Sequence, residues 1–237
     1  MSVRLTTVKL PKMMMMIKKC IVLLFLIFIP LAGFSQNKDF GIWYGISAEH
    51  KFSKKLELDL SSNIRTFSNA SKIEEAFLEG GLTYNLKKHL SVAGSYRLSR
   101  NIENNNSLYF QHKIMFDFKG SLALGKLNLN GRLRFQTRTK TYITSESDKF
   151  PDYTGRIKLK ALYKTQTFPV DPYIYAETFC PMFSHNSGTI GKNRFSAGIE
   201  LNILKKHSVD FEYIFQRDYQ PHLSDLNIIS VNYDIKF

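Results

Sequence analysis

The stretch LNLNGRLRFQTR, residues 127–138, alternates apolar and polar side chains almost without a break. Because successive side chains of a β-strand point to opposite faces, this period of two predicts a strand with one apolar and one polar face. The same alternation returns in residues 56–65 and 229–237, and such segments follow one another from Phe40 to the C-terminus. No segment beyond residue 36 has the spacing of an amphipathic helix over three turns. The sequence therefore predicts an all-β fold.

The first 36 residues form a leader of different composition, with five basic residues, no acidic residue and the apolar run Ile21–Ile29. A basic segment, a short apolar segment and small residues at the cleavage site define a secretory signal, and Gly33 and Ser35 supply the small residues here. We expect cleavage after Ser35. The alternative, an uncleaved membrane anchor, is disfavoured because the apolar run is shorter than a spanning helix and ends at Pro30.

We therefore expect the chain to have two parts: a signal peptide, residues 1–35, and a single β-domain, residues 36–237. Translation could start at Met1 or at one of the methionines 13–16, because the residues before them add nothing to the signal. Five of the 33 basic residues lie in the leader, which leaves 28 basic against 20 acidic residues and a net charge of +8. The basic residues are spread over the whole length of an exported chain, so we expect no nucleic-acid partner.

Eleven candidate strands can be read from the alternation. They begin near Phe40, Leu56, Ile73, Leu90, Leu108, Leu127, Tyr153, Pro172, Asn193, Ser208 and Leu226. Short basic turns and longer polar loops alternate between them, as in an up-and-down barrel of the bacterial outer membrane. Since single-chain bacterial barrels have an even number of strands, we predict an antiparallel up-and-down transmembrane β-barrel of 10 or 12 strands.

A soluble barrel would show the same alternation. The composition of the polar face therefore decides whether the barrel lies in water or in a membrane. That face is densely charged, which suits a polar lumen. Aromatic residues near strand ends suit the interfacial girdles of a membrane barrel. The candidates for these girdles are Phe40, Trp43, Tyr44, Tyr84, Tyr96, Phe118, Tyr153, Tyr163, Tyr173, Phe195 and Tyr233. We therefore expect the outer membrane, with its lipid as the surrounding partner.

Five short motifs resemble a family of Bacteroidota outer-membrane β-barrels known as domain of unknown function 2490. They are Asp39-Phe40-Gly41-Ile42-Trp43, Leu56 to Arg65 with Glu57, Gly94-Ser95-Tyr96-Arg97, Arg132-Leu133-Arg134-Phe135-Gln136, and Asn193-Arg194-Phe195 followed by Gly198. The resemblance spans most of the mature chain and implies the fold and the compartment, but no activity. The last strand, ending in Phe237, is similar to the C-terminal signal that barrel-assembly machinery recognises, so this machinery is an expected partner.

Inward charges are not mixed evenly along the chain. We predict a basic wall of Arg132, Arg134, Arg138, Arg156, Lys158 and Lys160. Across the lumen we predict an acidic wall of Glu57, Asp59, Glu75 and Glu79, joined by Asp210 and Glu212. In a wider barrel, such opposed walls favour passage or binding of small polar solutes. In a narrow barrel, the walls meet as charge-assisted pairs and fill the interior.

The sequence thus favours a narrow passive channel or a small-ligand barrel, with a closed structural barrel as the alternative. One hydrolase-like motif faintly resembles outer-membrane phospholipase A: His185 would be the base, Ser187 the nucleophile and Asn193 the orienting amide. Its spacing departs from that family and its loop is glycine-rich, so we expect a protein that is not an enzyme. The six histidines are scattered, Cys180 stands alone after the leader, and no phosphate or dinucleotide motif occurs, so we expect no metal site and no cofactor.

Overall fold

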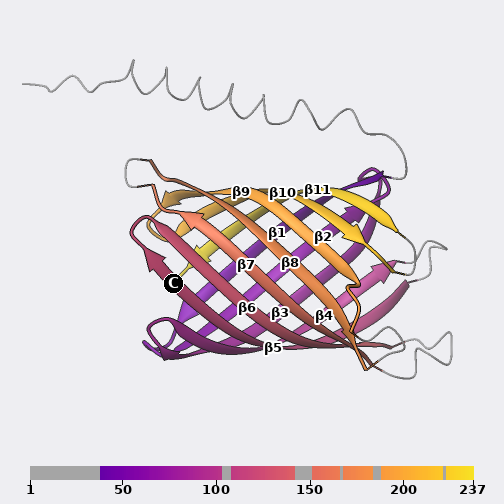
Figure 1. The fold of residues 1–237 in the computed structure, drawn as a ribbon, viewed down its shortest axis with the longest axis horizontal. Helices are drawn as coiled ribbons and strands as arrows, with labels where there is room; N and C mark the ends of the chain where they lie inside the picture. Colours follow the sequence, from indigo (N-terminus) through magenta and orange to yellow (C-terminus); the bar gives the residue numbers. More distant parts are fainter. Residues whose placement is uncertain (1–37, 103–107, 142–150, 166–167, 184–187, 221–222) are drawn as a thin grey trace, which may run out of the picture. The chain divides into compact units, whose positions relative to one another are not determined.

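The computed structural model describes residues 38–102, 108–141, 151–165, 168–183, 188–220 and 223–237. Over these residues, eleven strands form one closed barrel and run obliquely around it (Figure 1). The strands are β1 (Lys38–Lys51), β2 (Leu56–Phe67), β3 (Lys72–Lys87), β4 (Leu90–Ile102), β5 (Leu108–Leu124), β6 (Leu127–Lys140), β7 (Asp152–Tyr163), β8 (Val170–Met182), β9 (Lys192–Leu204), β10 (His207–Asp218) and β11 (Ser224–Lys236). Within the same residues, no helix is long and apolar enough to cross a membrane.

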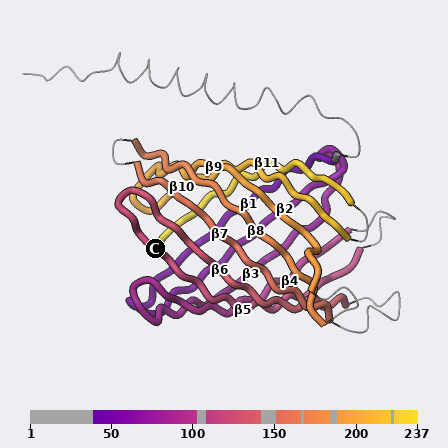
Figure 2. The backbone as a smooth tube through the Cα atoms, viewed as in Figure 1, coloured from indigo at the N-terminus to yellow at the C-terminus, as the bar shows by residue number. Residues whose placement is uncertain are grey.

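Every predicted strand is present, and each begins within two residues of its predicted start. The expected total of 10 or 12 strands is wrong. An odd number closes because β1 pairs with β11 in parallel, with Lys38 opposite Asp225 and Glu49 opposite Lys236, whereas all other neighbouring pairs are antiparallel. Figure 2 shows this seam as the indigo β1 beside the yellow β11. The backbone N–H of Phe237 donates to the carbonyl of Glu49 at 2.8 Å, which extends the seam to the last residue.

The barrel has two distinct ends. One, here called the turn end, is where β1, β3, β5, β7 and β9 end and β2, β4, β6, β8 and β10 begin. The other, the loop end, is where β2, β4, β6, β8 and β10 end and β3, β5, β7, β9 and β11 begin. At the turn end, Gly125 has a φ of +63°, a conformation that a two-residue hairpin requires and that glycine adopts without strain.

At the loop end, Asp39 holds the β2–β3 connection in place. Its carboxylate accepts backbone hydrogen bonds from Ser68 and Asn69, both at 2.8 Å. These two residues and Ala70 have φ values of 54°, 55° and 61°, which non-glycine residues adopt only at a cost. The two hydrogen bonds to Asp39 compensate for this local strain. Through them β1 contacts the β2–β3 connection, in addition to its pairing with β11.

The two faces of the strands differ as the alternation predicts. Outward apolar side chains are exposed, as in Leu133 (53%) and Leu159 (66%), whereas inward Met115 is 1% exposed and Ile228 0%. Two of the expected girdle aromatics are an exception. Trp43 and Tyr173 are buried inside the barrel at 8% and 5% exposure, because they alternate in register with the polar residues of their strands. The polar face of the sequence is therefore the lumen, and the site lies there.

Candidate functional site

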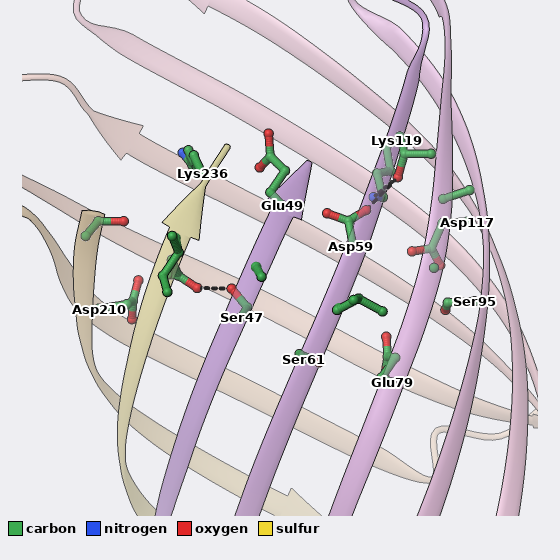
Figure 3. A pocket seen from close by; sticks show the side chains of 18 of the residues that line it. Ser47, Glu49, Asp59, Ser61, Glu79, Ser95, Asp117, Lys119, Asp210 and Lys236 are labelled. Atoms are coloured by element: carbon green, nitrogen blue, oxygen red, sulfur yellow. Dashed lines mark hydrogen bonds between the residues drawn. The ribbon is translucent and has the colours of Figure 1, made fainter. Parts of the chain in front are cut away.

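The turn-end half of the lumen contains an acidic chamber, a cavity of about 430 Å³ (Figure 3). Its charged lining consists of Glu49, Asp59, Glu79, Asp117, Glu200, Asp210 and Asp234 against Lys119, Lys160 and Lys236. Neutral hydroxyl groups satisfy several of these carboxylates. Thr83 donates to Asp59 at 3.1 Å, and Ser47 donates to Asp234. Because hydroxyl donors can be bonded without bringing a cation, the chamber keeps its negative charge.

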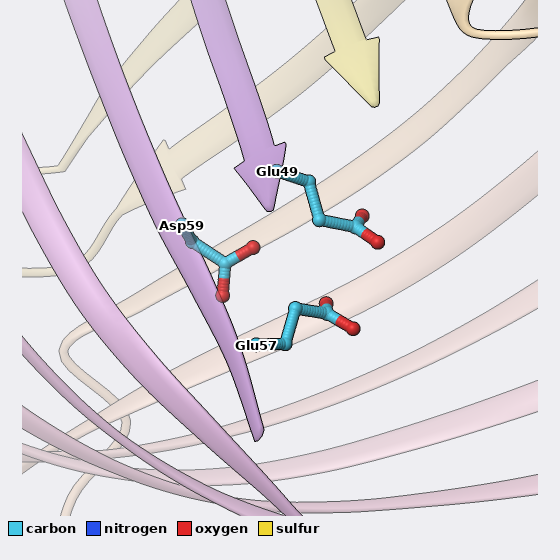
Figure 4. A group of neighbouring side chains, drawn as sticks. All are labelled: Glu49, Glu57 and Asp59. Carbon is cyan, nitrogen blue, oxygen red and sulfur yellow. The ribbon is translucent and has the colours of Figure 1, made fainter. Parts of the chain in front are cut away.

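Three carboxylates meet at the rim of this chamber, on Glu49, Glu57 and Asp59 (Figure 4). Each offers one oxygen, and these oxygens lie within 4.8 Å of one another. The ammonium group of Lys51 lies 3.1 Å from the Glu49 carboxylate and 3.6 Å from that of Glu57. Lys51, on the same strand as Glu49, thus supplies a positive charge to this cluster of carboxylates.

The loop-end half contains a basic chamber of about 490 Å³. Among the described residues, its charged lining consists of Arg97, Lys113, Arg138, Arg156, Lys192 and Arg194 against the carboxylate of Asp218. Polar uncharged groups (Gln136, Thr154 and Gln220) and the apolar side chains of Met115, Phe179 and Pro181 complete the wall. The two chambers share no lining residue, so their charges are separated along the barrel axis.

A smaller cavity of about 370 Å³ lies beside the acidic chamber at the turn end and shares Lys119 and Lys160 with it. Its lining is basic, with Lys87, Lys88, Lys119, Arg132, Lys158 and Lys160. Basic and acidic linings therefore also lie side by side in the turn-end half of the lumen.

Between the chambers lies a central layer of buried ion pairs. Arg134 binds both carboxylate oxygens of Asp117, at 2.6 and 2.7 Å, and Arg97 lies 2.5 Å from Glu79. Glu177 accepts from Arg132 at 2.6 Å and from Arg156 at 2.9 Å. Its side chain is only 2% exposed.

The layer is one ion pair thick. Arg97 lines the basic chamber, while its partner Glu79 lines the acidic chamber. Arg134 contacts Met115 of the basic chamber (3.1 Å, Nη1 to Sδ) and Asp117 of the acidic chamber. Single side-chain pairs are thus the only separation at these two places within the described residues.

Aromatic rings alternate with guanidinium groups in the same layer. Arg65 lies 4.2 Å from the ring centre of Trp43 and 4.8 Å from that of Phe77, and Arg97 lies 3.6 Å from Phe77. Arg194 continues the stack, at 5.0 Å from Trp43 and 4.8 Å from Phe179. Stacked guanidinium groups fill space and keep favourable contacts while they are removed from water.

Apolar and glycine packing fills the remaining cross-section. Ile214 and Ile228 point inward beside Trp43 at 1% and 0% exposure. Tyr173 lies over Gly198, where an added Cβ would come 2.5 Å from the Tyr173 ring, and its hydroxyl donates to Asp210 at 2.6 Å. The interior of an eight-stranded barrel is narrow enough for ordinary side chains to fill, and a barrel of eleven strands is wider. Here long or aromatic side chains fill the additional width.

The six residues of the predicted basic wall are divided among these features. Arg132, Arg134 and Arg156 belong to the central layer, and Arg138 pairs with Asp152 near the loop end at 2.6 Å. Lys158 and Lys160 lie over the rings of Tyr175 (3.4 Å) and Tyr173 (3.7 Å) in the turn-end half.

The predicted acidic wall is divided in the same way. Glu75 binds Arg65 and Lys113, and Glu79 binds Arg97. Glu57, Asp59 and Asp210 belong to the turn end, while Glu212 accepts from Ser196 at 2.6 Å. Among the described residues, no ion pair joins the predicted basic wall to the predicted acidic wall. The counterions are residues outside the two predicted walls, such as Asp117 and Glu177 for the basic wall and Arg65 and Arg97 for the acidic wall. The main separation of charge runs along the axis.

Several residues of the site were not part of the predicted walls: Arg65, Arg97, Lys113, Asp117, Glu177, Lys192 and Arg194. The alternation does place them on the polar face, so the signal for an inward position is present in the sequence. What the sequence lacks is their height along the tilted strands, which depends on the register between neighbours.

The hydrolase-like motif cannot be placed as a unit. His185 and Ser187 lie outside the described residues. Asn193 lies in β9, and its side-chain amide donates to the hydroxyl of Tyr219 at 3.2 Å. Because His185 is the residue that Asn193 would orient in the hydrolase alternative, the contacts of Asn193 alone do not test that alternative.

A sequence profile of the family described as "Protein of unknown function (DUF2490)" matches residues 40–227. The chain belongs to this family. No curated protein sequence matches it. The DUF2490 chain is similar in fold to the beta domain of the Bordetella autotransporter BrkA, with 10% identity, a TM-score of 0.48, and coverage of 74% of this chain and 82% of that one. It is also similar to the NanC porin, with 11% identity, a TM-score of 0.47, and coverage of 75% and 86%.

Proposed function

We propose that this DUF2490 protein is an outer-membrane β-barrel whose lumen is closed at mid-height by the central layer. The outer face supports a lipid environment: Leu78, Leu133 and Ile174 are 64%, 53% and 62% exposed on a surface whose inner side is charged. In water, such a continuous apolar exterior would be unfavourable, whereas a bilayer solvates it. Strands of 12 to 17 residues are long enough to cross.

Cell fractionation tests the environment. The mature protein is expected in the outer membrane, with heat-modifiable migration on a gel. A Leu133→Arg substitution should impair insertion, because a charge on the lipid face near the midplane costs about 2 to 4 kcal/mol. Recovery of the wild type as a soluble periplasmic protein would contradict the proposal. Two further predictions can be checked in the same cells: cleavage after Ser35, and recognition of the strand ending in Phe237 by barrel-assembly machinery. A Bacteroidota origin stays an expectation from the family resemblance.

The observation that supports closure is the burial of the ion pairs. Asp117 and Arg134 have side chains 4% and 9% exposed, and Glu177 is equally inaccessible between two guanidinium groups. A hydrated pore would expose these groups to water, where their attraction is weak. Their enclosure instead favours a sealed layer between two water-accessible chambers over the narrow passive channel.

Planar-bilayer recording tests closure. Wild-type protein, shown to be inserted, is expected to give no ohmic conductance. Replacing both members of the Arg134–Asp117 pair by Ala removes the separation without leaving an unpaired charge, so conductance should appear. The matched control is the same double replacement of the Arg138–Asp152 pair at the loop end, which should stay silent. Steady conductance of the wild type would instead support a passive channel.

The proposal includes no enzymatic activity. The motif at His185 and Ser187 has the serine and histidine of a hydrolase but departs in spacing from the phospholipase pattern. Purified barrel incubated with phospholipid, with and without calcium, should release no fatty acid. Release that a Ser187→Ala substitution abolishes would make a phospholipase-like hydrolase the better assignment.

A further inference from the structure

The basic chamber has more cations than the neighbouring carboxylates can neutralise. Within ion-pair distance, Glu75 is shared by Arg65, Lys113 and Arg97, and Glu177 by Arg132 and Arg156. Glu79 pairs with Arg97, which is already counted, and Asp218 pairs with Lys192. With Arg194, and counting only the described residues, seven cations of the central layer and the loop-end half share four carboxylates.

Arg194 is the cation with the poorest compensation. Among the described residues, its side chain has one polar partner, the Gln216 amide oxygen at 2.8 Å, and no carboxylate within 4.0 Å. It also lies against the ring faces of Trp43 and Phe179, and Glu177 attracts it from beyond ion-pair distance. Arginine remains charged at any physiological pH, so this charge cannot be relieved by loss of a proton.

Phe179 gathers three of these cations at the wall of the chamber. The Arg156 guanidinium lies 4.3 Å from the ring centre, the Arg194 guanidinium 4.8 Å and the Lys192 ammonium 5.8 Å. Like charges held this close repel one another. Ring contacts relieve only part of that repulsion, and an anion between the cations would relieve much more.

The buried polar atoms without a partner point the same way. Among the described residues there are four, and three are N–H donors: Trp43 Nε1, Arg65 Nε and Arg132 Nε. All three belong to the central layer or its aromatic stack. None of the three residues lines the basic chamber itself, but the described part of the layer that borders this chamber has N–H donors without an acceptor.

We propose that the basic chamber is a binding site for a small water-soluble oxyanion, a phosphate or carboxylate compound, held by Arg194, Arg156 and Lys192. Guanidinium groups bind the oxygens of both groups in a two-pronged geometry, and Lys192 adds a third positive contact. Gln136 and Thr154 offer hydrogen bonds to the uncharged part of the ligand. A cavity of about 490 Å³ admits a compound larger than inorganic phosphate. This site goes beyond the proposed closure of the lumen, because it needs only the loop-end half of the barrel.

Trp43 supplies the readout, since it is the single tryptophan of the chain and its ring lies 5.0 Å from Arg194. Folded protein in uncharged detergent would be titrated with sodium phosphate at constant pH and ionic strength, with sodium chloride as the balancing salt. The emission of Trp43 should change in a saturable way, and calorimetry should give the same dissociation constant.

Three variants locate the site. Arg194→Gln should weaken phosphate binding about tenfold or more, because one charge-assisted contact is lost. Gln136→Glu, which keeps the side-chain shape and places a carboxylate beside Arg156, should abolish binding without unfolding the barrel. The matched control is Lys236→Gln in the acidic chamber, which should change the dissociation constant less than twofold.

The proposal is overturned if phosphate gives no saturable response, or if all three variants bind it as the wild type does. It is also overturned if Lys236→Gln weakens binding as much as Arg194→Gln. Each variant is first checked for heat-modifiable migration, so that loss of the fold is not read as loss of the site. These results do not depend on bilayer conductance, and a conducting wild type would leave them unchanged.

Discussion

The acidic and basic chambers are lined by several of the same strands, yet they carry opposite charge. β4 places Ser95 in the acidic chamber and Arg97, two residues later, in the basic chamber. β5 does the same with Asp117 and Lys113. The lining of β4 thus changes from uncharged to basic, and β5 changes from the carboxylate of Asp117 to the ammonium of Lys113. The difference shows that height along the barrel, more than position around it, organises the lumen.

The two chambers also differ in how their charges are satisfied. Carboxylates of the acidic chamber accept from hydroxyl groups, such as Thr83 and Tyr173, which add no charge. Cations of the basic chamber need acceptors, and among the described residues these are carboxylates, several of them shared, and amide oxygens such as those of Gln136 and Gln216. Carboxylates of the acidic chamber therefore find uncharged hydrogen-bond donors within the barrel wall. The cations of the basic chamber outnumber the described carboxylates near them.

The largest expected effect is on the layer between the chambers. Glu177→Gln removes the carboxylate that Arg132 and Arg156 share, so two buried guanidinium groups lose their partner. We expect a loss of about 3 to 5 kcal/mol in the free energy of unfolding. Denaturant unfolding in lipid vesicles, followed by Trp43 emission, measures it. Glu200→Gln in the acidic chamber is the control, with an expected loss below about 1 kcal/mol. Equal losses would show that burial in the layer is not what matters.

A smaller effect is expected from packing at the border of the acidic chamber. Gly198→Ala places a methyl group 2.5 Å from the Tyr173 ring and 2.9 Å from the carbonyl of Phe211. The ring must move, and we expect a loss of about 1 to 3 kcal/mol in stability. Gly94→Ala is the matched change on the outer face, where the added atom meets Phe116 at an ordinary 3.9 Å. The same unfolding assay should show little or no loss for Gly94→Ala, and a similar loss in both would refute the packing argument.

Opposite charge in the chambers should be visible as opposite selectivity for charged reagents. In a Cys180→Ser background, Thr154→Cys places a thiol in the basic chamber and Ser61→Cys places one in the acidic chamber. A negatively charged thiosulfonate should react faster at position 154, and a positively charged one at position 61, each by about tenfold. The reaction rates in detergent at low salt measure this. The same preference at both positions would contradict the axial separation of charge.

The smallest effect is expected near the loop end, at the exposed pair of Arg138 and Asp152. Their side chains are 44% and 59% exposed, so water screens their attraction. Asp152→Asn should therefore change the free energy of unfolding by less than about 1 kcal/mol. A loss as large as that of Glu177→Gln would mean that exposure does not distinguish the pairs of the layer from those at the loop end.

The sequence was sufficient for the strands and their faces, because alternation is a local property: residues 127–138 form β6 with the predicted polar side inward. It was not sufficient for closure. The parallel pairing of Lys38 with Asp225 joins the two ends of the β-domain, and no local pattern records it. Trp43 was misplaced in a girdle because a tryptophan near a strand end suits an interface, whereas its register with Asp39 and Ser47 puts it inside.

The candidate site was predictable only in composition. Arg134 was assigned to the lumen, yet its partner is Asp117 on the adjacent strand and not a residue of the opposite wall. Such pairings follow from strand tilt and register, which sequence alternation leaves open. The predicted transverse opposition therefore describes part of the turn-end half and misses the larger separation along the axis.

The most direct test of the central claim, closure of the lumen between the two chambers, is labelling from one side of a membrane. The Ser61→Cys and Thr154→Cys proteins, each in the Cys180→Ser background, would be reconstituted in the same way into sealed vesicles and exposed to an impermeant thiol reagent outside. If the central layer seals the lumen, each barrel exposes only one chamber, so the labelled fractions of the two proteins should add to one whatever the mixture of orientations. Complete labelling of both proteins before detergent is added would contradict the closed barrel.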